Sequence, residues 1–230
     1  MGKETEQKQE IVNQGVHTYS QEESYVWPQE PILREQLEWF QDQKLALMVH
    51  WGVYNQLGMV ASWALSDEDA EWSRKTVDWT DDGELFKRQY RALNRAFDPV
   101  AFQPEEWAKM AKECGFRYLI LTTKHHDGFC LWDTAYTEYK TTAEDCPFHT
   151  HKYADIVRAM FDAFRKEGLG IGAYFSKADW HCPDYWETEK ALTGKTTRNL
   201  TYDPKENPGA WERFRAFTRD QILELGKQYG

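Results

Sequence analysis

The chain has 230 residues and a formal net charge of −10, with 29% charged and 41% hydrophobic residues. This length can bury a core of one or two domains. The acidic balance excludes a basic stripe of the kind that neutralises a nucleic-acid backbone, so nucleic acid is not an expected partner. No apolar run approaches the roughly 18 residues of a membrane-spanning helix, so no membrane partner is expected either.

The chain begins with a predicted polar lead-in over residues 1–30, which lacks the apolar stretch of a secretory signal. We expect the folded part to occupy residues 31–230. A short helix is predicted over 33–41. The five apolar residues 45–49 that follow are typical of a parallel strand buried on both faces. Residues 62–83 are rich in Asp, Glu, Ser and Trp, which indicates a long loop with short turns.

Strands and helices then alternate to the end of the chain. The predicted elements are a helix over 104–114, a strand over 118–123, a helix over 152–167, a strand over 170–176, a loop over 183–208 and a last helix that frays from 226. Proline opens the helix at 104 and glycine follows it at 115, the usual punctuation of helix ends. This alternation predicts an α/β fold with a parallel sheet.

The sheet is expected to belong to a (β/α)8 TIM-type barrel. No strand is followed by GxGxxG, which disfavours a dinucleotide-binding domain, and no Walker motif is present. A complete barrel needs eight strands in typically about 250 residues, whereas only three strands can be recognised in this chain. The sequence therefore predicts about the first three β/α units, truncated before the fourth strand.

Aromatic and imidazole side chains follow the predicted strands. His50 follows the first, His125 and His126 follow the second, and Tyr174 lies at the end of the third. In a parallel barrel these ends converge on one mouth, where the active site forms. Adjacent histidines on a regular strand point to opposite faces, and no carboxylate stands in register with them. No metal or other cofactor is therefore predicted.

Several segments resemble the α-L-fucosidases of glycoside hydrolase family 29. They are Gln43–Tyr54 with its His-Trp-Gly, Phe97–Lys112, Tyr118–Asp133 with Thr-Thr-Lys-His-His-Asp-Gly-Phe, Asp155–Val157, and Gly172–Ser176 followed by Asp179-Trp180. The Thr-Thr-Lys-His-His-Asp-Gly-Phe motif, with Leu-Trp-Asp behind it, is highly specific. The resemblance covers residues 37–230 and implies a retaining hydrolase that releases terminal α-L-fucose from glycans.

The resemblance also implies roles for individual residues. His50, His125 and His126 would hydrogen-bond the sugar, and Tyr174 would line the same pocket. Many family members carry a Glu-Trp pair after the first strand, where this chain has Ser62-Trp63. Trp63 is expected to keep its contact with the sugar, while the missing glutamate indicates a divergent subgroup. A fucosylated glycan or oligosaccharide is the expected substrate, and the oligomeric state stays open.

The resemblance implies that the catalytic carboxylates lie beyond residue 230, so no catalytic residue is predicted within the chain and the 230 residues alone are predicted to be inactive. Asp127 and Asp179 lie near strand ends, but the resemblance gives them neither role, and they are expected to structure loops or to support the binding residues from behind. Two alternatives remain: a catalytically inactive fucose-binding fragment and a metal-dependent barrel hydrolase. A fucose titration together with an activity assay distinguishes the inactive binding fragment from an active enzyme. Bound zinc would indicate the metal-dependent hydrolase.

Overall fold

The computed structural model describes residues 26–75 and 77–230, and the chain divides into two compact units, 1–44 and 45–230. Most of the predicted polar lead-in lies outside the described residues. The first unit contains helix α2 (Pro31–Gln43), which has proline in its first turn and buries none of its side chains. The helix predicted over 33–41 is therefore confirmed, with two further residues at each end.

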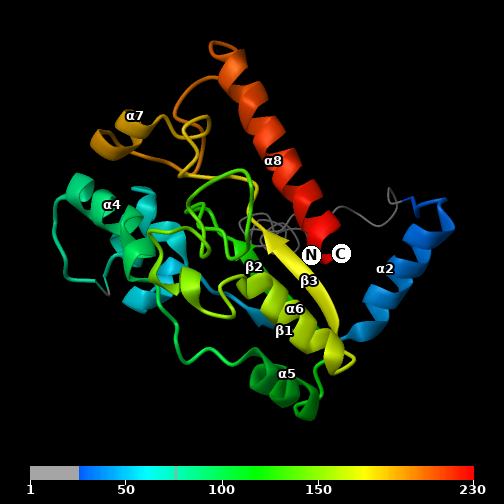
Figure 1. Cartoon of the computed structure of the whole chain (residues 1–230). Helices are drawn as coiled ribbons and strands as arrows, with labels where there is room; N and C mark the ends of the chain where they lie inside the picture. The colour runs from blue at the N-terminus through cyan, green and yellow to red at the C-terminus, as the bar shows by residue number, and fades with distance from the viewer. Residues whose placement is uncertain (1–25, 76) are drawn as a thin grey trace, which may run out of the picture. The chain divides into compact units, whose positions relative to one another are not determined.

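The second unit is built on a three-stranded parallel sheet in the order β1 (Ala46–Val49), β2 (Tyr118–Lys124) and β3 (Gly170–Phe175) (Figure 1). Val49 pairs with Leu121, and Leu121 pairs in turn with Ala173. This register brings the carboxyl ends of all three strands to one edge. The predicted alternation of parallel strands and helices is confirmed.

Burial on both faces, predicted for the first strand, is wrong for β1. Met48 at its centre is 50% exposed, whereas Leu119 and Leu121 of β2 are fully buried. The reason is position in the sheet, because β2 has a strand on each side and β1 has only β2 beside it in the described part of the chain. The apolar run therefore predicted the strand correctly but predicted more burial than β1 has.

Helices and short turns link the strands. They are η2 (Val53–Leu57), η3 (Ser62–Leu65), α3 (Ala70–Ser73), α4 (Gly83–Arg91), η4 (Leu93–Ala96), α5 (Pro104–Glu113), η5 (Pro147–Thr150), α6 (Ile156–Lys166), α7 (Thr188–Thr193) and α8 (Pro208–Tyr229). Helix α6 packs against β2, β3, α5 and α8. No helix in the described residues is both long enough and apolar enough to span a bilayer.

Two helix boundaries differ from prediction because of side-chain hydrogen bonds. Helix α6 begins at Ile156 rather than 152, since the Asp155 carboxylate accepts the backbone N–H of Arg158 at 2.9 Å and caps the helix. Helix α8 does not fray at 226. Its last turn is held by the Tyr229 hydroxyl, which donates to the Asp155 carboxylate at 2.7 Å.

Candidate functional site

The structure brings the five predicted binding residues into one cluster at the carboxyl edge of the sheet. The ring centroid of His50, after β1, lies 4.8 Å from that of His125, after β2, and 5.9 Å from that of Tyr174 in β3. Trp63 in η3 has its ring centroid 5.5 Å from His125 and 5.1 Å from His126. Residues from four separate segments therefore meet, while their role in binding stays a prediction.

A hydrogen bond from the loop after β1 sets the proton position of His125. The backbone N–H of Ser62 points at Nδ1 of His125 with 3.4 Å between the nitrogens, and the Ser62 hydroxyl contacts the same atom. A backbone N–H can only donate, so Nδ1 of His125 accepts and its proton resides on Nε2. His125 thus presents a hydrogen-bond donor at its other ring nitrogen.

His126 has the opposite arrangement. Its Nδ1 lies 3.1 Å from the carbonyl oxygen of Ala178, which can only accept, so Nδ1 carries the proton. Nε2 of His126 is therefore an acceptor. In His50, Nδ1 lies 3.0 Å from the hydroxyl of Thr122, a partner that allows either tautomer. The cluster offers both a donor and an acceptor, which suits hydroxyl ligands.

Burial keeps these imidazoles uncharged. Desolvation lowers the pKa of His125 to about 2, aided by the nearby His126 and His50. Desolvation likewise lowers the pKa of His50, and it lowers the pKa of His126 against the opposing hydrogen bond to Ala178. All three rings are neutral at pH 7, so they act as hydrogen-bonding groups rather than as counter-ions.

The indole of Trp63 forms an apolar wall beside the imidazoles. Its ring centroid lies 5.9 Å from that of Trp180, which also stacks on His126 at 5.0 Å. The guanidinium of Arg198 lies 4.5 Å from the Trp63 ring centre and is ion-paired with Asp69 at 2.5 Å. The loop after β3 therefore fixes the orientation of Trp63 from 135 residues away, which no local pattern could indicate.

Tyr54 is a further member of the cluster that prediction from residue patterns missed. It is fully buried, its ring centroid lies 5.6 Å from His50 and 5.7 Å from His125, and its hydroxyl has no hydrogen-bond partner in the described residues. The signal available was its place four residues after His50 within the same motif.

Asp127 and Asp179 organise the loops beneath this cluster. Asp127 accepts the Tyr90 hydroxyl at 2.9 Å and the Phe129 N–H at 3.1 Å. Asp179 accepts the N–H of His181 at 3.0 Å and the ammonium of Lys124 at 2.9 Å. Both carboxylates thus hold loop backbone in place, which is one of the two roles expected for them.

Close packing against Asp179 explains the glycine of the His-His-Asp-Gly motif. Gly128 has φ +82°, in the left-handed region, and a Cβ there would lie 2.5 Å from Oδ1 of Asp179 and 2.7 Å from Cβ of His181. Both the backbone conformation and the space exclude a side chain. The motif thus joins β2 to the loop after β3.

No metal site accompanies the cluster in the residues that the structure describes. No group of three or more His, Cys, Asp or Glu side chains is arranged there to hold an ion. His149 and His151, which stand close in sequence, lie apart from the five clustered residues: His149 bonds the Cys146 carbonyl and His151 stacks on Phe148. The arrangement supports hydrogen bonding to a neutral polar ligand.

Comparison with known proteins gives a consistent result. Residues 12–230 match the family profile described as Alpha-L-fucosidase. The chain is 31% identical over 189 residues to the rat tissue alpha-L-fucosidase, which covers 82% of this chain and 39% of the rat protein. It is 34% identical over 169 residues to a putative alpha-L-fucosidase 1 of rice, covering 72% of this chain and 27% of that protein.

Solved structures show the same similarity. An alpha-L-fucosidase from Bacteroides thetaiotaomicron has a TM-score of 0.64 and 30% identity, with 90% of this chain and 40% of that chain covered. Alpha-L-fucosidase isoenzyme 1 of Paenibacillus thiaminolyticus has a TM-score of 0.62 and 32% identity over 85% and 41% of the two chains. A further Bacteroides structure is described as a trapped covalent intermediate with 2-fluoro-fucosyl fluoride. The chain thus spans less than half the length of these relatives.

Proposed function

This chain belongs to the alpha-L-fucosidase family, and on that premise we propose that it supplies the sugar-binding half of an enzyme that removes terminal α-L-fucose from glycans. The observation that carries the proposal is the cluster of His50, His125, His126, Tyr174 and Trp63 at one edge of the parallel sheet. We assign the five side chains to fucose binding.

The chemistry of the cluster suits a deoxysugar. Fucose presents hydroxyl groups on one part of its ring and a methyl group at C5, so its pocket needs directional donors and acceptors beside an apolar wall. The Nε2–H of His125 and the Nε2 of His126 provide a donor and an acceptor, as their Nδ1 partners require. The face of Trp63 provides the wall.

The remaining catalytic parts belong to the same proposal. A glycosidase of the retaining type needs one carboxylate as nucleophile and one carboxyl as acid/base, held about 5–5.5 Å apart. From the family resemblance we propose that both lie beyond residue 230. In support, Asp127 and Asp179 are engaged with loop N–H groups, Tyr90 and Lys124. We further propose that β1, β2 and β3 are the first strands of a (β/α)8 barrel, supported by their parallel order.

The test is hydrolysis of an aryl α-L-fucoside by the full-length protein, with calorimetric binding of L-fucose measured in parallel. Turnover together with retention of the anomeric configuration, followed by NMR, is the expected result. Binding without turnover would instead identify a catalytically inactive fucose-binding protein. Absence of both would refute the proposal, and activity that a chelator abolishes would point to the metal-dependent alternative.

A further inference from the structure

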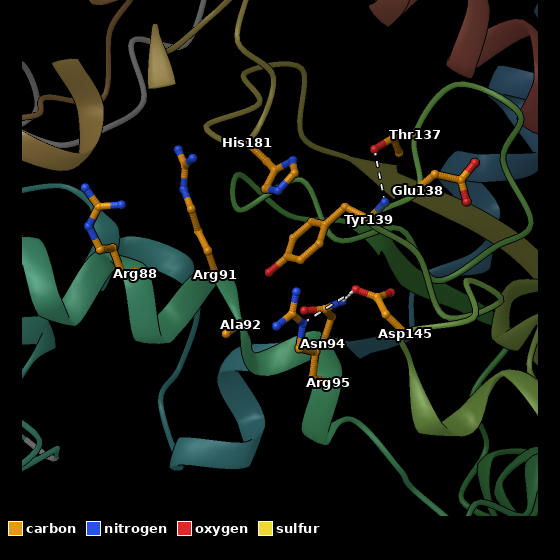
Figure 2. A pocket seen from close by; sticks show the side chains of 10 residues that line it. All are labelled: Arg88, Arg91, Ala92, Asn94, Arg95, Thr137, Glu138, Tyr139, Asp145 and His181. Atoms are coloured by element: carbon orange, nitrogen blue, oxygen red, sulfur yellow. Dashed lines mark hydrogen bonds and ion pairs between the residues drawn. The ribbon is translucent and has the colours of Figure 1, made fainter. Parts of the chain in front are cut away.

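A polar pocket lies beside α4 and contains none of the five clustered residues. It has a volume of about 400 Å³, and its lining includes Arg88, Arg91, Arg95, Tyr139 and His181. Arg88 and Arg91 lie three residues apart on α4, Arg95 follows on η4, and all three line the same pocket. In Figure 2, Arg91 and Arg95 lie beside the ring of Tyr139, and Arg88 lies farther along α4.

Arg91 is a partly buried cation in the lining of this pocket. Its Nη2 donates to the carbonyl oxygen of Trp180 at 2.8 Å, but it forms no ion pair with any residue that the structure describes. Its neighbours are already matched: Arg88 binds the Glu84 carboxylate at 2.8 Å. Burial lowers the pKa of Arg91, as does the like charge of Arg88, whereas Tyr139 and the Asp179 carboxylate act in the opposite direction. A guanidinium held in this way gains stability from an added anion.

Tyr139 supplies a second unsatisfied group in the same pocket. The residue is only 6% exposed, and its hydroxyl has no hydrogen-bond partner in the described residues. The ring is fixed by parallel stacking on His181, with centroids 4.1 Å apart, and by an edge contact with Phe129. In Figure 2 the hydroxyl points into the pocket, toward the side lined by the arginines. A buried hydroxyl without a partner is costly, and an anionic oxygen would accept its hydrogen.

The two acidic side chains of the lining leave this position open. Asp145 accepts from Asn94 at 2.8 Å and lies 3.8 Å from Arg95. Glu138 is exposed, and its carboxylate points away from the arginines in Figure 2. Asp145 therefore neutralises Arg95 in part, but neither it nor Glu138 forms an ion pair with Arg91 in the described residues, and Asp179 acts on Arg91 only from beyond ion-pair distance. The donor groups left over are a guanidinium and a phenol.

We propose that this pocket binds the oxyanion of a small ligand through Arg91 and Tyr139. The planar guanidinium matches two oxygens of a carboxylate or sulfate, and the phenol donates to one of them. Because the volume of about 400 Å³ exceeds the needs of a bare ion, the oxyanion can be free or carried on a sugar. This inference does not depend on fucose hydrolysis.

The test is calorimetric titration of the full-length protein at constant ionic strength with sodium sulfate and, separately, with galactose 6-sulfate. We expect Arg91→Gln to weaken binding about tenfold or more and Tyr139→Phe to weaken it about threefold, since both remove donors to a charged group. Arg117→Gln is the matched control, because Arg117 is exposed at the amino end of β2 and forms no ion pair in the described residues.

The two titrants separate the sources of the oxyanion. Tighter binding of galactose 6-sulfate than of sulfate identifies an anionic sugar, whereas equal binding identifies a free oxyanion, and either result supports the pocket. Thermal melts show that each variant is folded, and Arg91→Lys, which keeps the charge but loses the fork, replaces Arg91→Gln if that variant fails to fold. The proposal is overturned if neither ligand binds, or if Arg91→Gln and Arg117→Gln have the same effect.

Discussion

Lys124 and the two histidines that follow it, His125 and His126, are neighbouring polar residues that use their hydrogen-bonding groups in different ways. Lys124 is fully buried and completely matched: its ammonium binds Asp179 at 2.9 Å and Gln221 at 2.8 Å. His125 and His126 each bond the protein through Nδ1, and their Nε2 atoms have no partner in the described residues. The charged group stabilises the fold, while the neutral rings keep hydrogen-bonding capacity for a ligand. A buried polar group whose hydrogen bonds are all made within the protein indicates a structural role, whereas one that keeps a free donor or acceptor indicates a binding role.

The largest expected effect on stability comes from breaking the buried ion pair between Lys124 and Asp179. Asp179→Asn should lower the free energy of unfolding by about 3–5 kcal/mol, because it leaves the buried Lys124 ammonium without a counter-charge. The measurement is urea unfolding of the full-length protein. Glu84→Gln is the control, since the Arg88–Glu84 pair is exposed and should contribute less than about 1 kcal/mol. Equal losses in the two variants would contradict the comparison.

The second prediction concerns how the free energy of unfolding depends on pH, to which Asp127 and His125 contribute with opposite signs. Burial raises the pKa of Asp127 to about 7 from its ordinary 3.8. Between these values the folded state binds more protons than the unfolded state, so the free energy of unfolding falls as pH rises from about 4 to about 7. For His125, with a folded pKa of about 2 against 6.5, the unfolded state binds more protons and stability rises with pH up to about 6.5.

Asp127→Asn isolates the first of these opposed contributions. We expect the variant to lose the destabilisation that develops between pH 4 and 7, so its stability should rise more steeply with pH than that of the parent protein. Urea unfolding at half-unit pH steps measures the slope. Parallel curves for variant and parent would show that Asp127 is ionised in the folded state at pH 4, contrary to its buried position.

Substitution of the clustered histidines should affect activity rather than stability. His50→Ala and His125→Ala are each expected to lower kcat/KM on aryl fucosides by more than tenfold, because a lost hydrogen bond to the sugar costs about 1–3 kcal/mol. Steady-state kinetics of the full-length protein give the ratio. His149→Ala serves as control, since His149 is exposed and bonds only the Cys146 carbonyl. Near-normal kinetics in both cluster variants would remove them from the site.

The smallest expected effect concerns Ser62, which acts through His125. Ser62→Ala removes the hydroxyl but keeps the N–H that bonds Nδ1. We expect a threefold to tenfold loss in kcat/KM, in line with one neutral hydrogen bond of about 0.5–1.5 kcal/mol. Ser62→Thr, which restores the hydroxyl, should recover most of the loss. A loss in Ser62→Ala that Ser62→Thr fails to rescue would indicate a packing role instead.

Sequence patterns predicted the parts of the fold that local rules determine. The strand over 118–123 and the helix over 104–114 were found within one residue, because apolar runs and terminal Pro and Gly mark such elements directly. Helix α4 was missed at the end of the predicted loop 62–83, since only Phe86 and Tyr90 form its buried apolar stripe. Its signals were the Asp82 cap, which accepts from the N–H of Glu84, and the Glu84–Arg88 pair.

The site divides in the same way. His50, His125, His126 and Tyr174 were predictable because parallel strands end at one edge, and that rule needs only the order of the elements. The bond between Ser62 and His125 was not predictable, and neither was the position of Arg91 in the separate pocket beside α4, since each depends on how segments far apart in sequence meet. Long-range contacts between loops leave no periodic pattern.

The most direct test of the comparison is NMR of the histidine ring nitrogens in the full-length protein, with and without L-fucose. The account predicts that His125 stays neutral with its proton on Nε2 down to about pH 4, that His126 carries its proton on Nδ1, and that L-fucose shifts the Nε2 signals of both. A His125 ring that titrates near pH 6.5 and does not respond to L-fucose would contradict it.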